Sequence, residues 1–328
     1  MLDPAARPER MRAASIGECM VEFHRRPDGS YGRGFGGDTL NCALYLARLG
    51  IPTDYVTMLG DDRLSQEMLD AWAAEGIGTG LVGRIPGRLP GLYLIETADR
   101  GERTFLYWRS AAPARDLIRL RGDDLAAELA QHNLIYLSGI TLSLFDREGR
   151  SRLPELLSGL RSRGAKVAFD GNYRPRGWPD LDEACTAFTS ILRQTDIALP
   201  TFDDETALFD DDSPQATIER MRAAGVAEIV VKRGEQPCLV AADGAVAEVP
   251  PASRVSPVDT TAAGDSFNAG HLAERMRGWP ACRRRGGWPQ ARRSRDRASH
   301  CGDSAFRDAR WTLTTASFGG AGQRRLIS

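Results

Sequence analysis

The chain has 328 residues, a length that suits one large domain with a small appendage, and a formal net charge of −1. This charge balance provides no overall basic surface for nucleic acid or for an anionic membrane, so we expect neither as a partner and favour a small molecule. The six cysteines form no CxxC pair, which argues against a zinc site or a disulfide framework and favours a reducing cytoplasm.

Strand-like and helix-like segments alternate along the chain. Strand-like residues 14–23 precede a helical face at positions 40, 43, 44 and 47, and Gly50 and Pro52 end that helix. The next strand-like segments are 54–58, 134–137, 166–170, 196–199 and 228–232. Most are nearly continuous apolar runs, as expected of parallel strands covered by helices on both faces. The alternation predicts an α/β fold, a doubly wound sheet flanked by helices, and Asp243-Gly244 predicts a two-residue hairpin after it.

Two stretches depart from this alternation. One is glycine-rich, residues 31–37, and the other is a pair of aromatic segments, 91–96 and 103–109, around a turn-like segment. The aromatic pair predicts a hairpin with no intervening helix. Two interpretations remain open, a small β lid over a site or an edge hairpin of the main sheet. An exposed aromatic strand at 105–108 would be a pairing liability, so we also expect a homodimer through such a lid.

The character of the sequence changes after Arg277. The remaining residues are rich in Arg, contain no Lys and follow neither helical nor strand periodicity. A native segment of this kind would be a disordered basic tail. The other interpretation is a shifted reading frame.

Residues 258–270 carry the most informative chemistry, because small residues run into a predicted helix there. Without bulky side chains, the backbone N–H groups of Ala262, Ala263 and Gly264 can converge on a phosphate at the helix N-terminus and form an anion hole. Asp265 would then stand beside the transferred phosphoryl group and accept the proton of an attacking hydroxyl. From the residues alone, an ordinary helix cap is the favoured interpretation of Asp265.

Residues 259–265 resemble the signature of the ribokinase-like (phosphofructokinase-B) sugar kinases, with Ala262 at the usual first glycine. Gly36-Gly37 before the first long helix and residues 230–234 are similar to two further motifs of that family. Within the family, the resemblance is greatest to bacterial kinases of 2-keto-3-deoxygluconate. The segments that carry it are 16–22, 34–41, 89–93, 101–109, 137–140 and 172–175.

The resemblance implies a kinase domain at 13–277, with lid segments at about 18–36 and 90–110, followed by the anomalous tail at 278–328. It implies ATP-dependent phosphorylation of 2-keto-3-deoxygluconate to its 6-phosphate, with Mg²⁺ bridging the phosphates. The residues implied for the sugar acid are Gly37, Asp38, Asn41, Tyr93, Tyr107, Arg109 and Arg174. Those implied for ATP are Asn172, Thr201, Lys232, Arg233, Gly234, Gln236 and Gly264. Glu205 is a candidate outer-sphere partner of the metal, or else a solvated acid.

Arg109 and Arg174 are the residues that favour a sugar acid, because an Arg fork can bind a carboxylate with two parallel hydrogen bonds. The alternatives are a kinase of a neutral ketose such as fructose, in which these would be solvated arginines, and a catalytically impaired sugar-binding product with an altered C-terminus. A Walker-type NTPase is excluded, since Lys166 and Lys232 precede Val and Arg rather than Ser or Thr. The glycines at 32–37 only superficially resemble a dinucleotide-binding loop.

Overall fold

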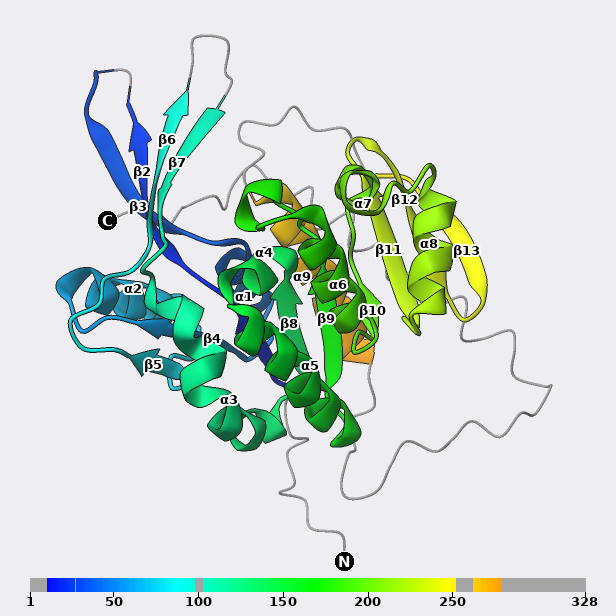
Figure 1. Ribbon diagram of the computed structural model, residues 1–328, viewed down its shortest axis with the longest axis horizontal. Coiled ribbons are helices and arrows are strands. Elements are labelled where there is room, and N and C mark those ends of the chain that lie inside the picture. Colours follow the sequence, from blue (N-terminus) through cyan, green and yellow to red (C-terminus); the bar gives the residue numbers. More distant parts are fainter. Residues whose placement is uncertain (1–10, 27, 98–102, 252–261, 279–328) are drawn as a thin grey trace, which may run out of the picture.

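The protein contains two β-sheets of unequal size, one with nine strands and one with four (Figure 1). A computed structural model describes residues 11–26, 28–97, 103–251 and 262–278. Apart from Gly278, the Arg-rich tail lies outside the described residues, so both interpretations of it stay predictions, as do the boundaries at 13 and 277. No helix in the described part of the chain has the length and apolarity needed to span a membrane.

Parallel strands form most of the large sheet. In spatial order its strands are β13 (Ala245–Val249), β12 (Gln236–Ala242), β11 (Glu228–Arg233), β10 (Ile197–Ala198), β9 (Lys166–Asp170), β8 (Leu134–Ser138), β1 (Ala13–Ile16), β4 (Thr53–Leu59) and β5 (Val82–Arg84). Neighbours from β11 to β5 pair in parallel, whereas β12 and β13 are antiparallel. Asp243 and Gly244 have φ angles of 51° and 81°, which confirms the predicted hairpin turn.

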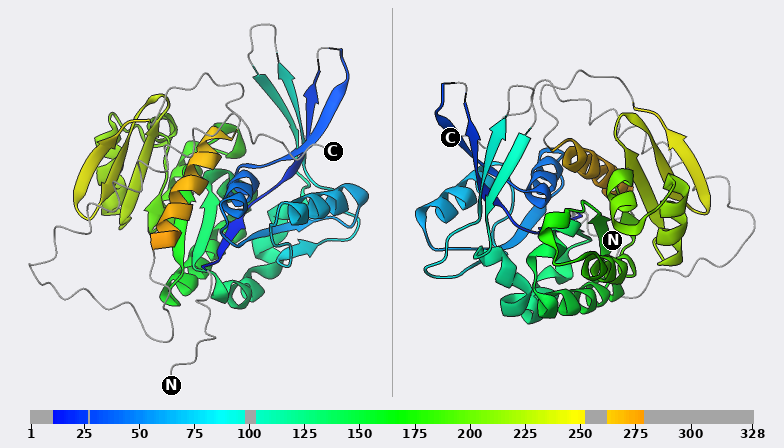
Figure 2. Two further views of the ribbon diagram at one scale, coloured as in Figure 1. Left: turned by 180° about the vertical axis from the view of Figure 1, so that it is seen from behind. Right: turned by 45° about the horizontal axis from the view of Figure 1, so that its top comes forward.

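Helices cover both faces of this sheet (Figures 1 and 2). On one face lie α3 (Leu117–Glu128), α4 (Gly139–Leu144), α5 (Arg147–Ser162), α6 (Leu181–Leu192), α7 (Phe202–Phe209) and α8 (Pro214–Ala223). On the other lie α1 (Asp38–Arg48), α2 (Arg63–Ala74) and α9 (Ala263–Gly278). Short 3₁₀ turns occupy Pro113–Asp116, Leu129–Gln131 and Pro175–Gly177. The predicted α/β architecture is therefore confirmed.

Successive side chains of each strand point to opposite faces of the sheet, so the hydrophobic core consists of two layers. In β8, Ile135 and Leu137 pack under α5 and α6, while Leu134 and Tyr136 pack under α1 and α9. Several helices begin at a side chain that accepts a backbone N–H, which satisfies donors that the helix itself leaves unpaired. These caps are Asp62, Ser138, Asp146, Asp180 and Ser213.

The small sheet stands above the carboxyl ends of the parallel strands (Figure 1). Its order is β3 (Tyr31–Gly36), β2 (Met20–Arg25), β6 (Leu92–Thr97) and β7 (Arg103–Trp108). The predicted aromatic hairpin is confirmed as β6 and β7, which pair antiparallel. The interpretation of this hairpin as an edge of the main sheet is wrong, because it pairs with β2 instead.

The prediction of one continuous strand at 14–23 is also wrong. The chain leaves the large sheet after β1 and enters the small sheet at β2. At the break, a Cβ added to Gly17 would lie 2.1 Å from Thr39 Oγ1, so only a glycine lets the backbone pass this close to α1. The two strands share an apolar pattern but belong to different sheets.

An aromatic cluster around Phe188 anchors α6 to the large sheet. Its ring centroid lies 5.5–6.4 Å from those of Phe169, Tyr173, Trp178 and Phe209. Because Phe188 is buried, we expect Phe188→Ala to lower the free energy of unfolding by about 3–5 kcal/mol. Leu181→Ala, an exposed position on the same helix, should change it by less than about 0.5 kcal/mol. Chemical denaturation of both variants measures the difference, and equal losses would contradict this account of the core.

Candidate active site

A cleft of about 1900 Å³ lies between the small sheet and the carboxyl ends of the parallel strands. It brings together residues that are more than 200 positions apart in the sequence. The residues predicted for the site that line it are Gly37, Asp38, Asn41, Tyr93, Tyr107, Arg109, Asn172, Arg174, Thr201, Lys232, Ala262, Ala263, Gly264 and Asp265. The parallel strands end in this cleft, which is where ligands bind in open α/β sheets.

Four predicted residues are not part of this lining. Arg233, Gly234 and Gln236 lie at the turn between β11 and β12, where the Arg233 guanidinium donates to the Pro237 carbonyl and pairs with Glu248. The fourth, Glu205, is buried on α7. Their predicted roles stay predictions.

The N-terminus of α9 presents Asp265 to the cleft. Asn41 Nδ2 on α1 donates to Asp265 Oδ2 at 2.8 Å, which joins the two helices at this point. Burial, followed by the negative charge of Asp38, raises the pKa of Asp265 well above its usual range. Asp265 is thus a carboxyl that holds a proton more strongly than an exposed aspartate does.

The same helix end has the features of an anion site. Ser266 N–H donates to the Ala262 carbonyl, and the N–H groups of the preceding turn have no carbonyl within the helix to bond. Lys232 approaches this turn, since a Cβ added to Gly264 would lie 3.9 Å from Lys232 Nζ. Partial positive charge at the helix end and a full charge on Lys232 therefore face the same space.

Ala262 has a φ of 62°, a left-handed conformation that favours glycine. The family signature that this segment resembles has glycine there. The structure thus gives a physical reason for that glycine and shows that Ala262 keeps the same backbone conformation at some steric cost.

Asp38 begins α1, which packs against α9, and it also lines the cleft. Asn172 Nδ2 donates to Asp38 Oδ2 at 2.7 Å, and burial raises the pKa of Asp38. Asn172 directly follows the β9 strand end and has a φ of 35°, so a strained backbone aims its amide at Asp38.

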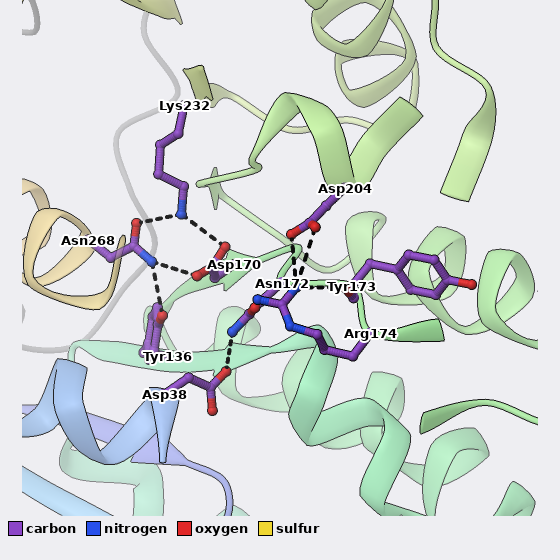
Figure 3. A network of polar contacts seen from close by, with 9 residues as sticks. All are labelled: Asp38, Tyr136, Asp170, Asn172, Tyr173, Arg174, Asp204, Lys232 and Asn268. Carbon is purple, nitrogen blue, oxygen red and sulfur yellow. Dashed lines mark hydrogen bonds and ion pairs between the residues drawn. The ribbon is translucent and has the colours of Figure 1, made fainter. Parts of the chain in front are cut away.

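A buried polar network beneath α9 was not predicted from the sequence (Figure 3). Asp170 ends β9 and accepts hydrogen bonds from Lys232 Nζ at 3.1 Å and from Asn268 Nδ2 at 2.8 Å. Asn268 also accepts from Lys232 Nζ at 3.1 Å and donates to Tyr136 Oη at 3.1 Å. The sequence contains a feature that could have predicted it, since Asp170 and Asn268 are polar residues within segments whose apolar pattern predicts burial.

The glycines of β3 make room for polar side chains of the small sheet. A Cβ added to Gly36 would lie 2.2 Å from Tyr93 Oη, and one added to Gly32 would lie 2.2 Å from the His24 ring. The Tyr93 hydroxyl donates to the buried carboxylate of Glu22. Glu22 therefore fixes the ring that faces the cleft, and the glycine-rich stretch is a structural requirement of this arrangement.

Both arginines predicted for a sugar acid already neighbour carboxylates. Arg109 Nη2 lies 2.5 Å from Glu18 Oε2, and Arg174 Nη1 lies 3.3 Å from Asp204 Oδ1. Burial raises the pKa of Glu18, and the Arg109 charge opposes that rise. Among the described residues, Arg109 Nε has no hydrogen-bond partner although it is buried. The Arg109 side chain is nevertheless partly exposed and lines the cleft.

Glu205 on α7 forms an ion pair with Arg220 at 2.7 Å. Burial raises the pKa of Glu205 to about 7. A Cβ added to Gly171 would lie 2.5 Å from Glu205 Oε1, so a side chain at position 171 would displace the Glu205 carboxylate. Within the described residues, no group of three or more His, Cys, Asp or Glu side chains has the arrangement of a metal site.

Removal of the Asp265 charge should stabilise the fold. A carboxyl whose pKa is raised in the folded protein contributes stability below its unfolded pKa and loses it as the pH rises through the folded pKa. We therefore expect Asp265→Asn, which can still accept from Asn41, to raise the free energy of unfolding by about 1–3 kcal/mol above that pKa and by nothing at low pH. Thermal unfolding from pH 4 to 9 measures this. Asp243→Asn in the exposed β12–β13 turn is the control, and an equal effect of both would overturn the argument.

Comparison with known proteins agrees with this geometry. A family model described as pfkB family carbohydrate kinase matches residues 11–283, so most of the Arg-rich tail lies outside the match. A 2-dehydro-3-deoxygluconokinase of Dickeya dadantii (strain 3937) is 46% identical over 278 residues, which cover 82% of this chain and 89% of that protein. Fructokinase-1 of Zea mays is 28% identical over 278 residues, 81% and 83% of the two chains.

Among solved structures, an Escherichia coli protein described as a putative ribokinase II in complex with ATP and Mg²⁺ superposes with a TM-score of 0.73 at 24% identity. The superposition covers 83% of this chain and 88% of that one, which confirms the predicted ribokinase-like fold. The resemblance found in the motifs thus extends over most of the sequence and of the fold. The chain belongs to the pfkB family of carbohydrate kinases.

Proposed function

We propose that this protein transfers the γ-phosphoryl group of ATP to the terminal hydroxyl of 2-keto-3-deoxygluconate, which is also called 2-dehydro-3-deoxygluconate. The observation that carries the proposal is the placement of Asp265 beside the anion site of α9, in a cleft that also contains Arg109 and Arg174. The Dickeya dadantii relative, which is 46% identical, is named a kinase of this sugar acid, whereas the Zea mays fructokinase is only 28% identical. A neutral ketose is therefore the less favoured substrate.

Asp265 acts as the general base in this proposal. Its carboxylate takes the proton of the sugar hydroxyl while the hydroxyl oxygen bonds to the γ-phosphorus and the bond to the β-phosphate oxygen breaks, releasing ADP. A raised pKa makes the ionised form of Asp265 a stronger base, although the rate then falls as the pH drops through that pKa. Asn41 orients the carboxylate through its hydrogen bond.

The residues of the cleft suit a nucleotide phosphate chain. The N–H groups of Ala262, Ala263 and Gly264 would hold the transferred group, with Lys232 beside them. Asn172 and Thr201 line the same cleft and are proposed to contact the nucleotide. Mg²⁺, when bound to the phosphate oxygens, would spread the charge that develops during transfer. An outer-sphere role for Glu205 stays a prediction, since its carboxylate pairs with Arg220.

The sugar acid is proposed to bind between the small sheet and α1. Gly37, Asp38 and Asn41 border one side, and Tyr93 and Tyr107 the other, with ring centroids 5.9 Å apart. The partly exposed guanidinium of Arg109 would donate to the substrate carboxylate. Arg174, held by Asp204 and by the Tyr173 carbonyl, would supply a second positive charge.

A coupled assay of ADP release tests the proposal on the full chain. With Mg²⁺ and ATP, 2-keto-3-deoxygluconate should be turned over with a kcat/KM at least about 100-fold above those of fructose, ribose and gluconate. Asp265→Asn should lower kcat by about 10²–10⁴-fold, because the base is lost, while Asp243→Asn leaves it unchanged. Equal turnover of the neutral sugars would overturn the acid assignment, and a near-normal Asp265→Asn rate would remove this residue from the mechanism.

We also propose that two copies of the chain associate through the small sheet. β7 is an edge strand of that sheet, and Leu106, Tyr107 and Trp108 on it are exposed. An apolar edge of this kind is normally covered by another chain. Light scattering at micromolar concentration should give twice the chain mass, and Leu106→Lys should reduce it to a monomer. Leu120→Lys, a matched exposed position on α3, should not. A monomeric wild type would contradict the proposal.

A further inference from the structure

Four elements of the fold meet at a single buried amide below the anion site. Asn268 on α9 uses both polar groups of its side chain, with Oδ1 accepting from Lys232 on β11, and Nδ2 donating to Asp170 on β9 and Tyr136 on β8. The side chain is fully buried. An amide that satisfies its donors and acceptor in this way cannot shift without leaving polar groups unpaired (Figure 3).

The position of Asn268 along α9 links this network to catalysis. Residues three apart in a helix lie on neighbouring positions of one face, so Asn268 stands one turn below Asp265. Its hydrogen bonds therefore set the rotation and height of the first turn of α9. That turn carries Asp265 and the N–H groups proposed to face the phosphate.

Charged groups of both signs surround Asp265, and the negative ones outnumber the positive one. The groups that act on Asp265 are Asp38, Asn41 and Cys42 from α1, Asp170 from β9, Tyr136 from β8 and Lys232 from β11. Two of them are carboxylates, and Lys232 is the cation that opposes them, with its Nζ 3.1 Å from Asp170 Oδ1. Lys232 thus neutralises Asp170 and faces the space beside Asp265 at the same time.

We propose that Lys232 and Asp170 are positioning residues that balance the charge on Asp265, and that Asn268 holds them and the first turn of α9 in place. The inference rests on the proposed role of Asp265 as the base. It assigns Lys232 a function beyond contact with ATP, and it gives roles to Asp170 and Asn268. The negative charge of Asp170 makes ionisation of Asp265 harder, and the positive charge of Lys232 makes it easier.

Two near-isosteric variants should therefore move the titration of Asp265 in opposite directions. Lys232→Met removes the positive charge and should shift the midpoint upward by about 1 pH unit, while Asp170→Asn removes a negative charge and should shift it downward by a similar amount. Glu228→Gln is the matched control. Glu228 is a buried carboxylate that also bonds α9, but through His271 and Arg275, well beyond Asp265 along the helix. It should leave the midpoint in place.

The titration can be read without turnover. In the full chain labelled with ¹³C at the aspartate carboxyl carbons, the Asp265 resonance is identified by its loss in Asp265→Asn, and its shift is followed by NMR against pH. Opposite shifts in the two variants support the proposal. No shift, or shifts of one sign, would overturn it even if the kinase assay succeeds. If the shifts are opposite but the chain phosphorylates no sugar, the proposed charge network is supported and the proposed function is contradicted.

Asn268→Leu tests the geometric part of the inference. It removes three hydrogen bonds without changing charge, so the first turn of α9 loosens, and displacement of a base by about 1 Å lowers kcat by about 10²-fold. The KM for the sugar acid should change by less than about threefold, because none of the residues proposed to bind the sugar is a hydrogen-bond partner of Asn268. A kcat close to that of the wild type would contradict a positioning role for Asn268.

Discussion

Burial of negative charge at the crossing of α1 and α9 constrains the rest of the active site. Asp265 and Asp38 lie at the starts of these helices. Burial raises the pKa of both carboxyls, and the negative charge of Asp38 further raises the cost of ionising Asp265. Amide groups meet both carboxylates, Asn41 on Asp265 and Asn172 on Asp38. Such an arrangement costs stability and is retained where a site needs a strong base. The helix ends that crowd the carboxylates also supply the partial positive charge that suits a phosphate.

Backbone freedom at a few positions lets polar groups approach the cleft. Gly32 and Gly36 leave space on β3 for His24 and Tyr93, and Gly171 leaves space for Glu205. Ala262 adopts a left-handed conformation despite its side chain. Tyr93 and Ala262 line the cleft, so tight packing and backbone strain occur at the site where the chemistry is proposed.

The sequence alone predicts the architecture well because alternating apolar segments depend mainly on local patterning. The sequence-based prediction fails at β1 and β2, where one apolar segment is divided between two sheets. The break occurs at Gly17, which packs against Thr39, and no local pattern reveals that contact. The cleft residues carried by the motifs are brought together, but the pairing of Arg109 with Glu18 and of Arg174 with Asp204 depends on tertiary contacts. Asn268 was missed for the same reason, since its three partners come from β8, β9 and β11.

The central claim is that this chain transfers a phosphoryl group to the terminal hydroxyl of a sugar acid, with Asp265 as the general base. Phosphorus–proton correlation NMR of the product, formed by the full chain from 2-keto-3-deoxygluconate, ATP and Mg²⁺, tests it most directly. The account predicts one phosphomonoester coupled to the terminal CH₂ protons of the acid, in an amount equal to the ADP released. A folded chain that yields no phosphorylated acid, or a phosphate on another carbon, would contradict it.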